Sequence, residues 1–243
     1  MIELIGAAIG TTLATGLGAV PVFFFGGHAS RWEPALWGLA AGTMTVASIV
    51  GLLKPALDEG SLGAVALGLA IGLLFVASVR LGLRGRDVSV GELRGKDVRT
   101  SVLVFSVLFF HSFPEGFAIG TAYASSVAGL SLFVILAIAL QNIPEGTSVA
   151  IPMAEAGFTR SQQFWAAVLT SAPQPVGAVI AYSLVETVRG LLPFSFAFAA
   201  GAMLTLVVSD LAPRALRGHG WRGMLGIASG ATVMLALSAL LGV

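Results

Sequence analysis

The sequence of 243 residues is too apolar for a soluble protein, because 56% of its residues are hydrophobic and only 10% are charged. Soluble domains carry about 25% charged residues, so a water-soluble fold could not cover its surface with polar groups. The chain has no cysteine, which excludes disulfides, zinc ribbons and thiolate metal sites. The net charge of +1 excludes no class of partner by itself, and the positions of the charges are more informative.

Eight apolar blocks follow one another along the chain, each near or above the ~20 residues that a helix needs to cross a bilayer. Their length and their lack of alternation favour helices over barrel strands. We therefore predict an all-α membrane protein with eight transmembrane helices. The predicted spans are residues 2–26, 33–56, 61–83, 101–123, 126–151, 159–185, 190–213 and 222–242.

The basic residues predict which way the spans point, because cytoplasmic loops of membrane proteins are enriched in Lys and Arg. One set of alternate loops holds eleven of the thirteen basic residues, and the other set holds only Lys54 and Arg189. We expect the eleven to be cytoplasmic and both termini to lie outside, in a protein of the inner (plasma) membrane. The segment 84–99 is predicted to be the one sizeable cytoplasmic loop. The eleven residues are Arg31, Arg80, Arg84, Arg86, Arg94, Lys96, Arg99, Arg160, Arg214, Arg217 and Arg222.

An internal repeat links the two ends of the chain. Residues 40–57 (AAGTMTVASIVGLLKPAL) align with 199–216 (AAGAMLTLVVSDLAPRAL) with seven identities at an offset of 159, although Ala- and Gly-rich helices can also match by chance. Equivalent helices are five spans apart, an odd number, so the two copies would be inverted in the membrane. We predict one polytopic domain over 1–243, with spans one to three and six to eight as inverted repeats around a central pair. This 3+2+3 arrangement is typical of secondary transporters with a central site.

Two short motifs repeat in the central pair of spans. HSFPEG occupies 111–116 and QNIPEG occupies 141–146, thirty residues apart in adjacent antiparallel helices. The proline of each motif lacks an N–H and presses on the carbonyl four residues earlier. Such freed carbonyls are tolerated in a membrane where groups of neighbouring helices or of a cavity wall form hydrogen bonds to them. The glycine that follows has no side chain, so a neighbouring group can approach the helix closely beside the carboxylate.

The same motifs bring together possible ligands for a divalent metal ion. His111 and Glu115 are four residues apart and therefore share one helical face. Gln141 and Glu145 repeat that spacing on the partner helix. Two ionised glutamates inside a membrane are costly without a partner, and a divalent cation would supply the missing charge. Nitrogen and oxygen ligands suit zinc, and less exclusively cadmium, iron or manganese.

The same residues are open to other interpretations. The two glutamates could be protonated and hydrogen-bond from helix to helix, or act as protonation sites in a proton-coupled carrier of a small organic solute. An intramembrane metalloprotease would need a His-Glu-x-x-His helix, and the sequence has none, so we predict no enzyme. Asp210, near the cytoplasmic end of span seven, could relay ions outward from the site or be an inert, solvated acid.

The paired motifs resemble those of the ZIP family of metal-ion transporters, in particular its bacterial GufA-like branch. The resemblance covers the whole chain, since the eight spans, the outward termini and the motifs in spans four and five all agree. It implies a 3+2+3 inverted-repeat fold, a homodimer, and uptake of a divalent metal, most of all zinc, into the cytoplasm by alternating access. It also implies that a bundle of spans one, four, five and six moves as an elevator against a scaffold of the other spans.

Carried over by position, the resemblance implies a metal site formed by His111, Glu115, Gln141 and Glu145. Met44 of span two occupies the place where some relatives contribute a thioether ligand. The expected partners are the transported ion, the lipid bilayer and a second copy of the chain. We expect no prosthetic group and no nucleic-acid partner.

The sequence departs from its relatives at a second, neighbouring metal site. Relatives hold that ion with Asn in span four, Asp or Asn in span five and Glu in span six. This chain has Ser112, Asn142 and Gln174 at those positions, so only the two shared glutamates would keep their charge. Because two carboxylates balance one divalent ion, we predict a single-metal site, with these three residues as remnants of a second one.

Overall fold

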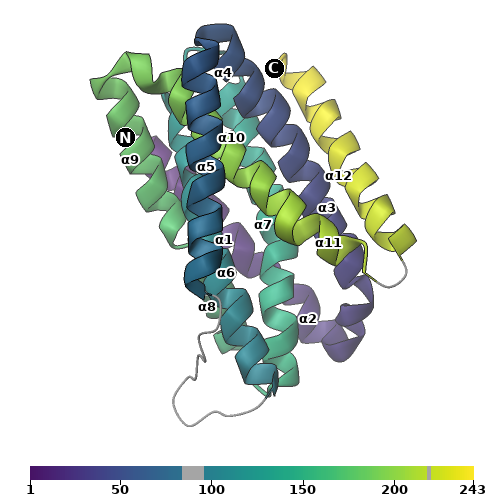
Figure 1. Cartoon of the computed structure of the whole chain (residues 1–243). Coiled ribbons are helices and arrows are strands. Elements are labelled where there is room, and N and C mark those ends of the chain that lie inside the picture. Colours follow the sequence, from purple (N-terminus) through teal and green to yellow (C-terminus); the bar gives the residue numbers. More distant parts are fainter. Residues whose placement is uncertain (84–95, 218–219) are drawn as a thin grey trace.

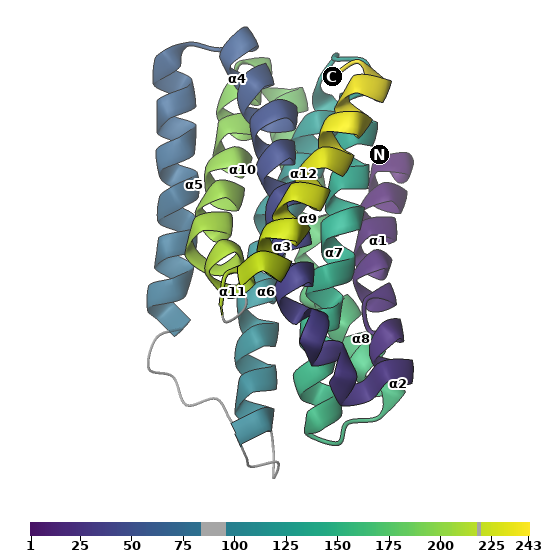
Figure 2. The same cartoon turned by 90° about the vertical axis from the view of Figure 1, so that its right-hand side faces the viewer.

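The computed structural model describes residues 1–83, 96–217 and 220–243, and this part of the chain is a bundle of long helices with no strand (Figure 1). Both chain ends lie at the end of the bundle where α4 is found, opposite α2 and α8 (Figure 2). Short 3-10 or π segments, labelled η, interrupt several helices. The elements are α1 (Ile2–Leu17), α2 (Val20–Phe25), η1 (Gly26–Trp32), α3 (Glu33–Val46), η2 (Ala47–Leu53), α4 (Lys54–Glu59), α5 (Leu62–Leu83), α6 (Lys96–Ala124), α7 (Leu130–Glu155), α8 (Arg160–Thr170), α9 (Pro173–Thr187), η3 (Arg189–Leu191), α10 (Leu192–Leu206), η4 (Val207–Leu211), α11 (Ala212–Ala215) and α12 (Gly220–Leu241).

Seven helical stretches of the described residues are long and apolar enough to cross a membrane, so the chain is a multi-pass membrane protein. They match predicted spans one to three and five to eight within a few residues, which confirms the all-α membrane fold. The seven do not include α6, which carries the polar HSFPEG sequence and packs alongside α7 and α9. The stretches are Ile2–Phe25, Ser30–Glu59, Leu62–Gly82, Leu130–Glu155, Arg160–Thr187, Arg189–Ala215 and Gly220–Leu241.

The predicted cytoplasmic loop, residues 84–99, falls mostly outside the described residues. Its last four residues belong to α6, which begins at Lys96 rather than at the predicted start of span four, residue 101. Residues 96–100 are mostly polar, and an apolar block marks where the hydrocarbon region begins and not where the helix begins.

Predicted spans two and seven each contain a π-helical segment at the same place. In span two, η2 is followed by Pro55 in α4, and in span seven η4 is followed by Pro213 in α11. A proline cannot donate to the carbonyl four residues earlier. Those carbonyls belong to Gly51 and Ser209, inside the π segments. The lost hydrogen bond gives a physical reason for an irregular turn at both places.

Helices from the two ends of the chain pack against each other in pairs, with α3 along α12 and α5 along α10. Glycines make these contacts close. A side chain at Gly42 would meet the backbone of Ile227, and one at Gly201 would meet the backbone of Leu69. Small residues let helix backbones approach in lipid, where packing contacts drive helix association. Much of the abundant glycine therefore serves helix packing.

Candidate metal centre

The helices α6 and α7 carry the two motifs, and they pack on each other and on α9 and α1 respectively. The proline of each motif lies inside its helix without ending it. The glycine after each glutamate touches a neighbouring backbone. A side chain at Gly116 would collide with Gln174 of α9, and one at Gly146 would collide with Thr15 of α1. These two glycines therefore allow α9 and α1 to lie directly against the turns that carry the carboxylates.

The polar residues of the two motifs are shielded from solvent. Glu115 and Glu145 are 1% and 2% exposed, and His111 is 3% exposed. Ionisable groups at this depth need hydrogen-bond or ionic partners, so their contacts decide what the site can do. The other predicted site residues that are buried are Met44, Ser112, Gln141, Asn142 and Gln174.

Glu115 is held by two side-chain amides. Gln141 donates from Nε2 to Oε1 of Glu115 at 2.8 Å, and Gln174 donates from Nε2 to Oε2 at 2.8 Å. The carboxylate therefore links α6 to α7 and to α9. Hydrogen bonds to an ionised acceptor are stronger than those between neutral groups, so this arrangement fixes the position of the Glu115 side chain.

The amide of Gln174 that holds Glu115 belongs to a further hydrogen-bond network with Asn142 and Thr11. Asn142 and Gln174 exchange amide hydrogen bonds of 3.2 and 3.3 Å. The Thr11 hydroxyl donates to Gln174 Oε1 at 2.8 Å, and Asn142 Nδ2 donates to the Thr11 carbonyl oxygen at 2.8 Å. Thr11 of α1 was not predicted as part of the site. The signal that could have found it is a group of threonines on one apolar helix, Thr11, Thr12 and Thr15.

Four buried polar atoms of the centre have no hydrogen-bond partner among the described residues. They are the two ring nitrogens of His111, Oε1 of Gln141 and Oε1 of Glu145. Buried polar groups without a partner are rare in folded proteins, and just two other buried side-chain atoms of the described chain lack one. Imidazole nitrogen, amide oxygen and carboxylate oxygen are all able to bind a divalent metal.

The centre carries acidic groups without a basic partner. No described Lys or Arg forms an ion pair with Glu115 or Glu145, so a bound cation would compensate them. Within residues 1–83, 96–217 and 220–243, no three His or acidic side chains are gathered as one ligand cluster. The described structure therefore does not bring His111, Glu115 and Glu145 together as one cluster of ligands, and the groups hydrogen-bonded to Glu115 are amides.

Three other predicted residues make contacts of their own. Met44 is buried in the apolar core on α3, a helix that packs on α7. Ser112 donates to the Leu108 carbonyl oxygen of its own helix at 3.0 Å. Asp210, in η4, pairs with Arg80 of α5, with 3.1 Å between Oδ2 and Nη1, and its side chain is 16% exposed. Asp210 is therefore neither unpaired nor fully solvated, and it ties span three to span seven.

Fold and centre together define a multi-pass helical membrane protein with carboxylate, imidazole and amide groups buried between its helices. The sequence model of the family described as ZIP Zinc transporter matches residues 86–238, more than half of the chain. The chain therefore belongs to the ZIP zinc transporter family. This confirms the resemblance seen in the paired motifs and the prediction of a transporter-family protein in place of an enzyme.

Individual relatives agree with this membership. Zinc transporter GufA of Myxococcus xanthus is 32% identical over 216 residues, which cover 84% of this chain and 85% of that protein. Zinc transporter ZIPB of Bordetella bronchiseptica is 30% identical over 259 residues, which cover 98% of this chain and 81% of that protein. A candidate zinc transporter of Arabidopsis thaliana is 38% identical over 207 residues, which cover 84% of this chain. The chain spans 33% of the length of that plant protein.

Proposed function

We propose that this chain transports divalent transition-metal ions, zinc above all, into the cytoplasm through the centre between α6 and α7. One observation carries the proposal. Of the six buried side-chain atoms that lack a hydrogen-bond partner in the described chain, four lie on His111, Gln141 and Glu145, three of the predicted ligands. The names of the bacterial relatives support zinc as the cargo. Cadmium, iron and manganese suit the same ligand types less exclusively.

The proposed ligands have different parts in holding one ion. Glu115 and Glu145 supply two negative charges, which balance one divalent cation in a medium where charge is costly. His111 contributes a neutral imidazole, Gln141 an amide oxygen, and Met44 a polarisable thioether. Gln141 donates to Glu115 from Nε2 and its Oε1 has no partner among the described residues, so the amide oxygen could bind an ion while this hydrogen bond is kept. The hydrogen bond would then hold the amide oxygen of Gln141 and the carboxylate of Glu115 in position for the same ion.

The packing supports an inverted repeat in a 3+2+3 arrangement within one domain over 1–243. Thr15 abuts Gly146, and Gln174 abuts Gly116. Thr15 and Gln174 are 159 residues apart, the offset of the sequence repeat. The π segments in spans two and seven add an independent correspondence. Equivalent contacts made by equivalent positions are what a two-fold related pair of repeats requires.

The grouping of the helices supports alternating access. α1 packs on α6, α7 and α9, and α6 packs on α7 and α9, whereas α3 pairs with α12 and α5 with α10; the two sets meet where α3 lies on α7 and α10 lies on α6. A bundle of the first four, moving as an elevator against a scaffold of the others, would expose the buried centre to each side in turn.

The distribution of basic residues supports an inner-membrane protein with both termini outside. The family resemblance supports a homodimer.

The site is expected to hold a single ion, because the family resemblance implies a glutamate at the position where this chain has Gln174. We expect the purified protein to bind one zinc ion per chain after equilibrium dialysis, and Gln174→Glu to bind two, because a third carboxylate would sit next to Glu115. Elemental analysis of the dialysed samples measures this. Gln162→Glu is the matched control, since it adds the same charge at an exposed helix start and should leave one ion. Two ions in the wild type would contradict the single-site proposal.

Zinc uptake tests the proposed function directly. Proteoliposomes with the wild-type chain should accumulate zinc inside, as reported by an enclosed fluorescent indicator, and Glu145→Ala should fall to the level of empty liposomes because one anionic ligand is lost. Glu155→Ala, on the exposed end of the same helix, should transport like the wild type. Equal accumulation by the wild type and Glu145→Ala would overturn the proposal. Proton flux without zinc flux would favour the proton-coupled solute carrier.

A further inference from the structure

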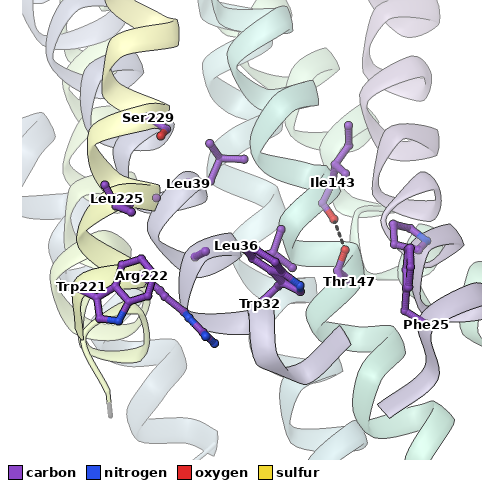
Figure 3. Close-up of a pocket in the computed structure, with 13 residues that line it drawn as sticks. Phe25, Trp32, Leu36, Leu39, Ile143, Thr147, Trp221, Arg222, Leu225 and Ser229 are labelled. Atoms are coloured by element: carbon purple, nitrogen blue, oxygen red, sulfur yellow. Dashed lines mark hydrogen bonds between the residues drawn. The ribbon is translucent and has the colours of Figure 1, made fainter. Parts of the chain in front are cut away.

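A cavity of about 590 Å³ opens between α2, α3, α7 and α12, and none of the predicted metal ligands lines it (Figure 3). Its walls are mainly apolar, with Leu36, Leu39 and Leu225 among their residues. The hydroxyl of Thr147 in the wall lies 2.6 Å from the carbonyl oxygen of Gly18 and 3.1 Å from that of Ile143, so it is already hydrogen-bonded. An apolar cavity offers water few hydrogen-bond partners, so hydrocarbon suits these walls better than water does.

One edge of the cavity is basic. Arg222 of α12 reaches toward Trp32 (Figure 3), with its guanidinium carbon 6.0 Å from the centre of the Trp32 ring and 5.4 Å from that of Trp221. Its Nη1 donates to the Arg31 carbonyl oxygen at 3.0 Å. In the described chain, no carboxylate forms an ion pair with Arg222. Two aromatic rings and one hydrogen bond therefore hold a positive charge that has no described anionic partner.

The surroundings of Arg222 place this edge at a membrane surface. Trp is enriched at the boundary between hydrocarbon and head groups, and Trp32 and Trp221 are 65% and 57% exposed. Arg222 belongs to the set of basic residues predicted to be cytoplasmic, on the side where anionic lipids concentrate. An Arg guanidinium binds phosphate through charge-assisted, often paired hydrogen bonds.

We infer that the cavity binds an anionic phospholipid, with the head-group phosphate at Arg222 and an acyl chain along α3, α7 and α12. The apolar cavity suits a hydrocarbon tail and the basic edge at Arg222 suits a negative charge, so the ligand needs both. A soluble anion lacks the tail, and a zwitterionic lipid lacks the net charge. The positive charge at this edge is complemented by an anionic head group, and this charge complementarity is the reason for choosing a lipid as the occupant.

Tryptophan quenching by brominated lipids tests the inference in the full chain. In a Trp37→Phe, Trp165→Phe background, the two remaining tryptophans both line the cavity. The protein is placed in lipid nanodiscs with increasing fractions of brominated phosphatidylglycerol or brominated phosphatidylcholine. We expect half-quenching by phosphatidylglycerol at a mole fraction about fivefold lower, the effect of one basic residue near an anionic surface. Arg222→Gln should remove this difference.

Two further variants separate the cavity from the surface in general. Arg160 lies over Phe23 and donates to its carbonyl oxygen, outside the cavity lining, so Arg160→Gln should keep the preference for the anionic lipid. Ser229→Phe narrows the cavity and should weaken quenching by phosphatidylglycerol. Equal quenching by both lipids in the parent protein, or the same loss in Arg160→Gln as in Arg222→Gln, would overturn the inference. Quenching confined to discs with one copy of the chain would overturn it too, by assigning the cavity to a second copy.

Discussion

Glu115→Gln is expected to lower the affinity for zinc by at least about 100-fold, since losing a residue that merely supports a metal ligand already costs about 10- to 100-fold. Glu115 supplies one of two negative charges and accepts from Nε2 of both Gln141 and Gln174. An amide at 115 is neutral and sets an NH₂ group against one of these donors, so charge and a hydrogen bond are lost together. Zinc binding to the purified chain, measured by competition with a fluorescent chelator, checks this.

Thr121→Val is the matched control for Glu115→Gln. Thr121 is buried on the same helix, and its hydroxyl donates to the Phe117 carbonyl oxygen at 2.8 Å. Removing it changes a buried polar group of α6 without touching the motif, so zinc affinity should stay within about twofold, on the scale of the smallest mutational effects. If both variants bound zinc like the wild type, Glu115 would not be a ligand.

Gly146→Ala is expected to destabilise the protein by about 1–3 kcal/mol, the usual cost of forcing extra atoms into a packed core. A Cβ at this position would meet the backbone carbonyl of Thr15. A backbone carbonyl cannot rotate away as a side chain does, so α1 would have to shift relative to α7. The melting temperature in detergent should fall by about 2–4 °C per kcal/mol, and thermal unfolding followed by circular dichroism measures it.

Gly10→Ala provides the comparison for Gly146→Ala, because Gly10 lies on α1 and a Cβ there has no atom within 4 Å. This change should leave the melting temperature the same or raise it slightly, since alanine favours the helix over glycine. Equal stability of the two variants would show that α1 and α7 do not pack as closely as the structure has them.

The membrane class and the positions of most spans could be predicted from the sequence because a bilayer imposes a local requirement. Each crossing needs a long apolar run whose backbone is satisfied within one helix, and such runs are visible one at a time. That His111 and Glu115 share one face of a helix is a prediction of the same kind, since four residues along a helix is a local distance, and both side chains are buried on α6. The start of α6 at Lys96 could not be predicted in this way. Hydropathy marks the segment that lies in the hydrocarbon region, and polar residues extend the helix beyond that segment.

The partners of the motif residues could not be read from the sequence. Gln174 is 59 residues from Glu115, and Thr11 is 131 residues from Asn142, yet each pair is joined by a hydrogen bond of 2.8 Å. Which polar groups meet depends on how closely α1 and α9 approach α6 and α7. That approach is set by non-local packing at the motif glycines and not by any local preference of the chain.

The sequence by itself determined that this is a membrane protein, that it is helical, and which residue types lie at its centre. The length of an apolar run and the helical periodicity are properties of a single element. The tertiary structure alone decided that Glu115 is held by two amides, that His111 and Glu145 keep buried atoms without described partners, and that Asp210 pairs with Arg80. Each of these depends on the distance between helices far apart in the chain, which close backbone packing in the membrane sets.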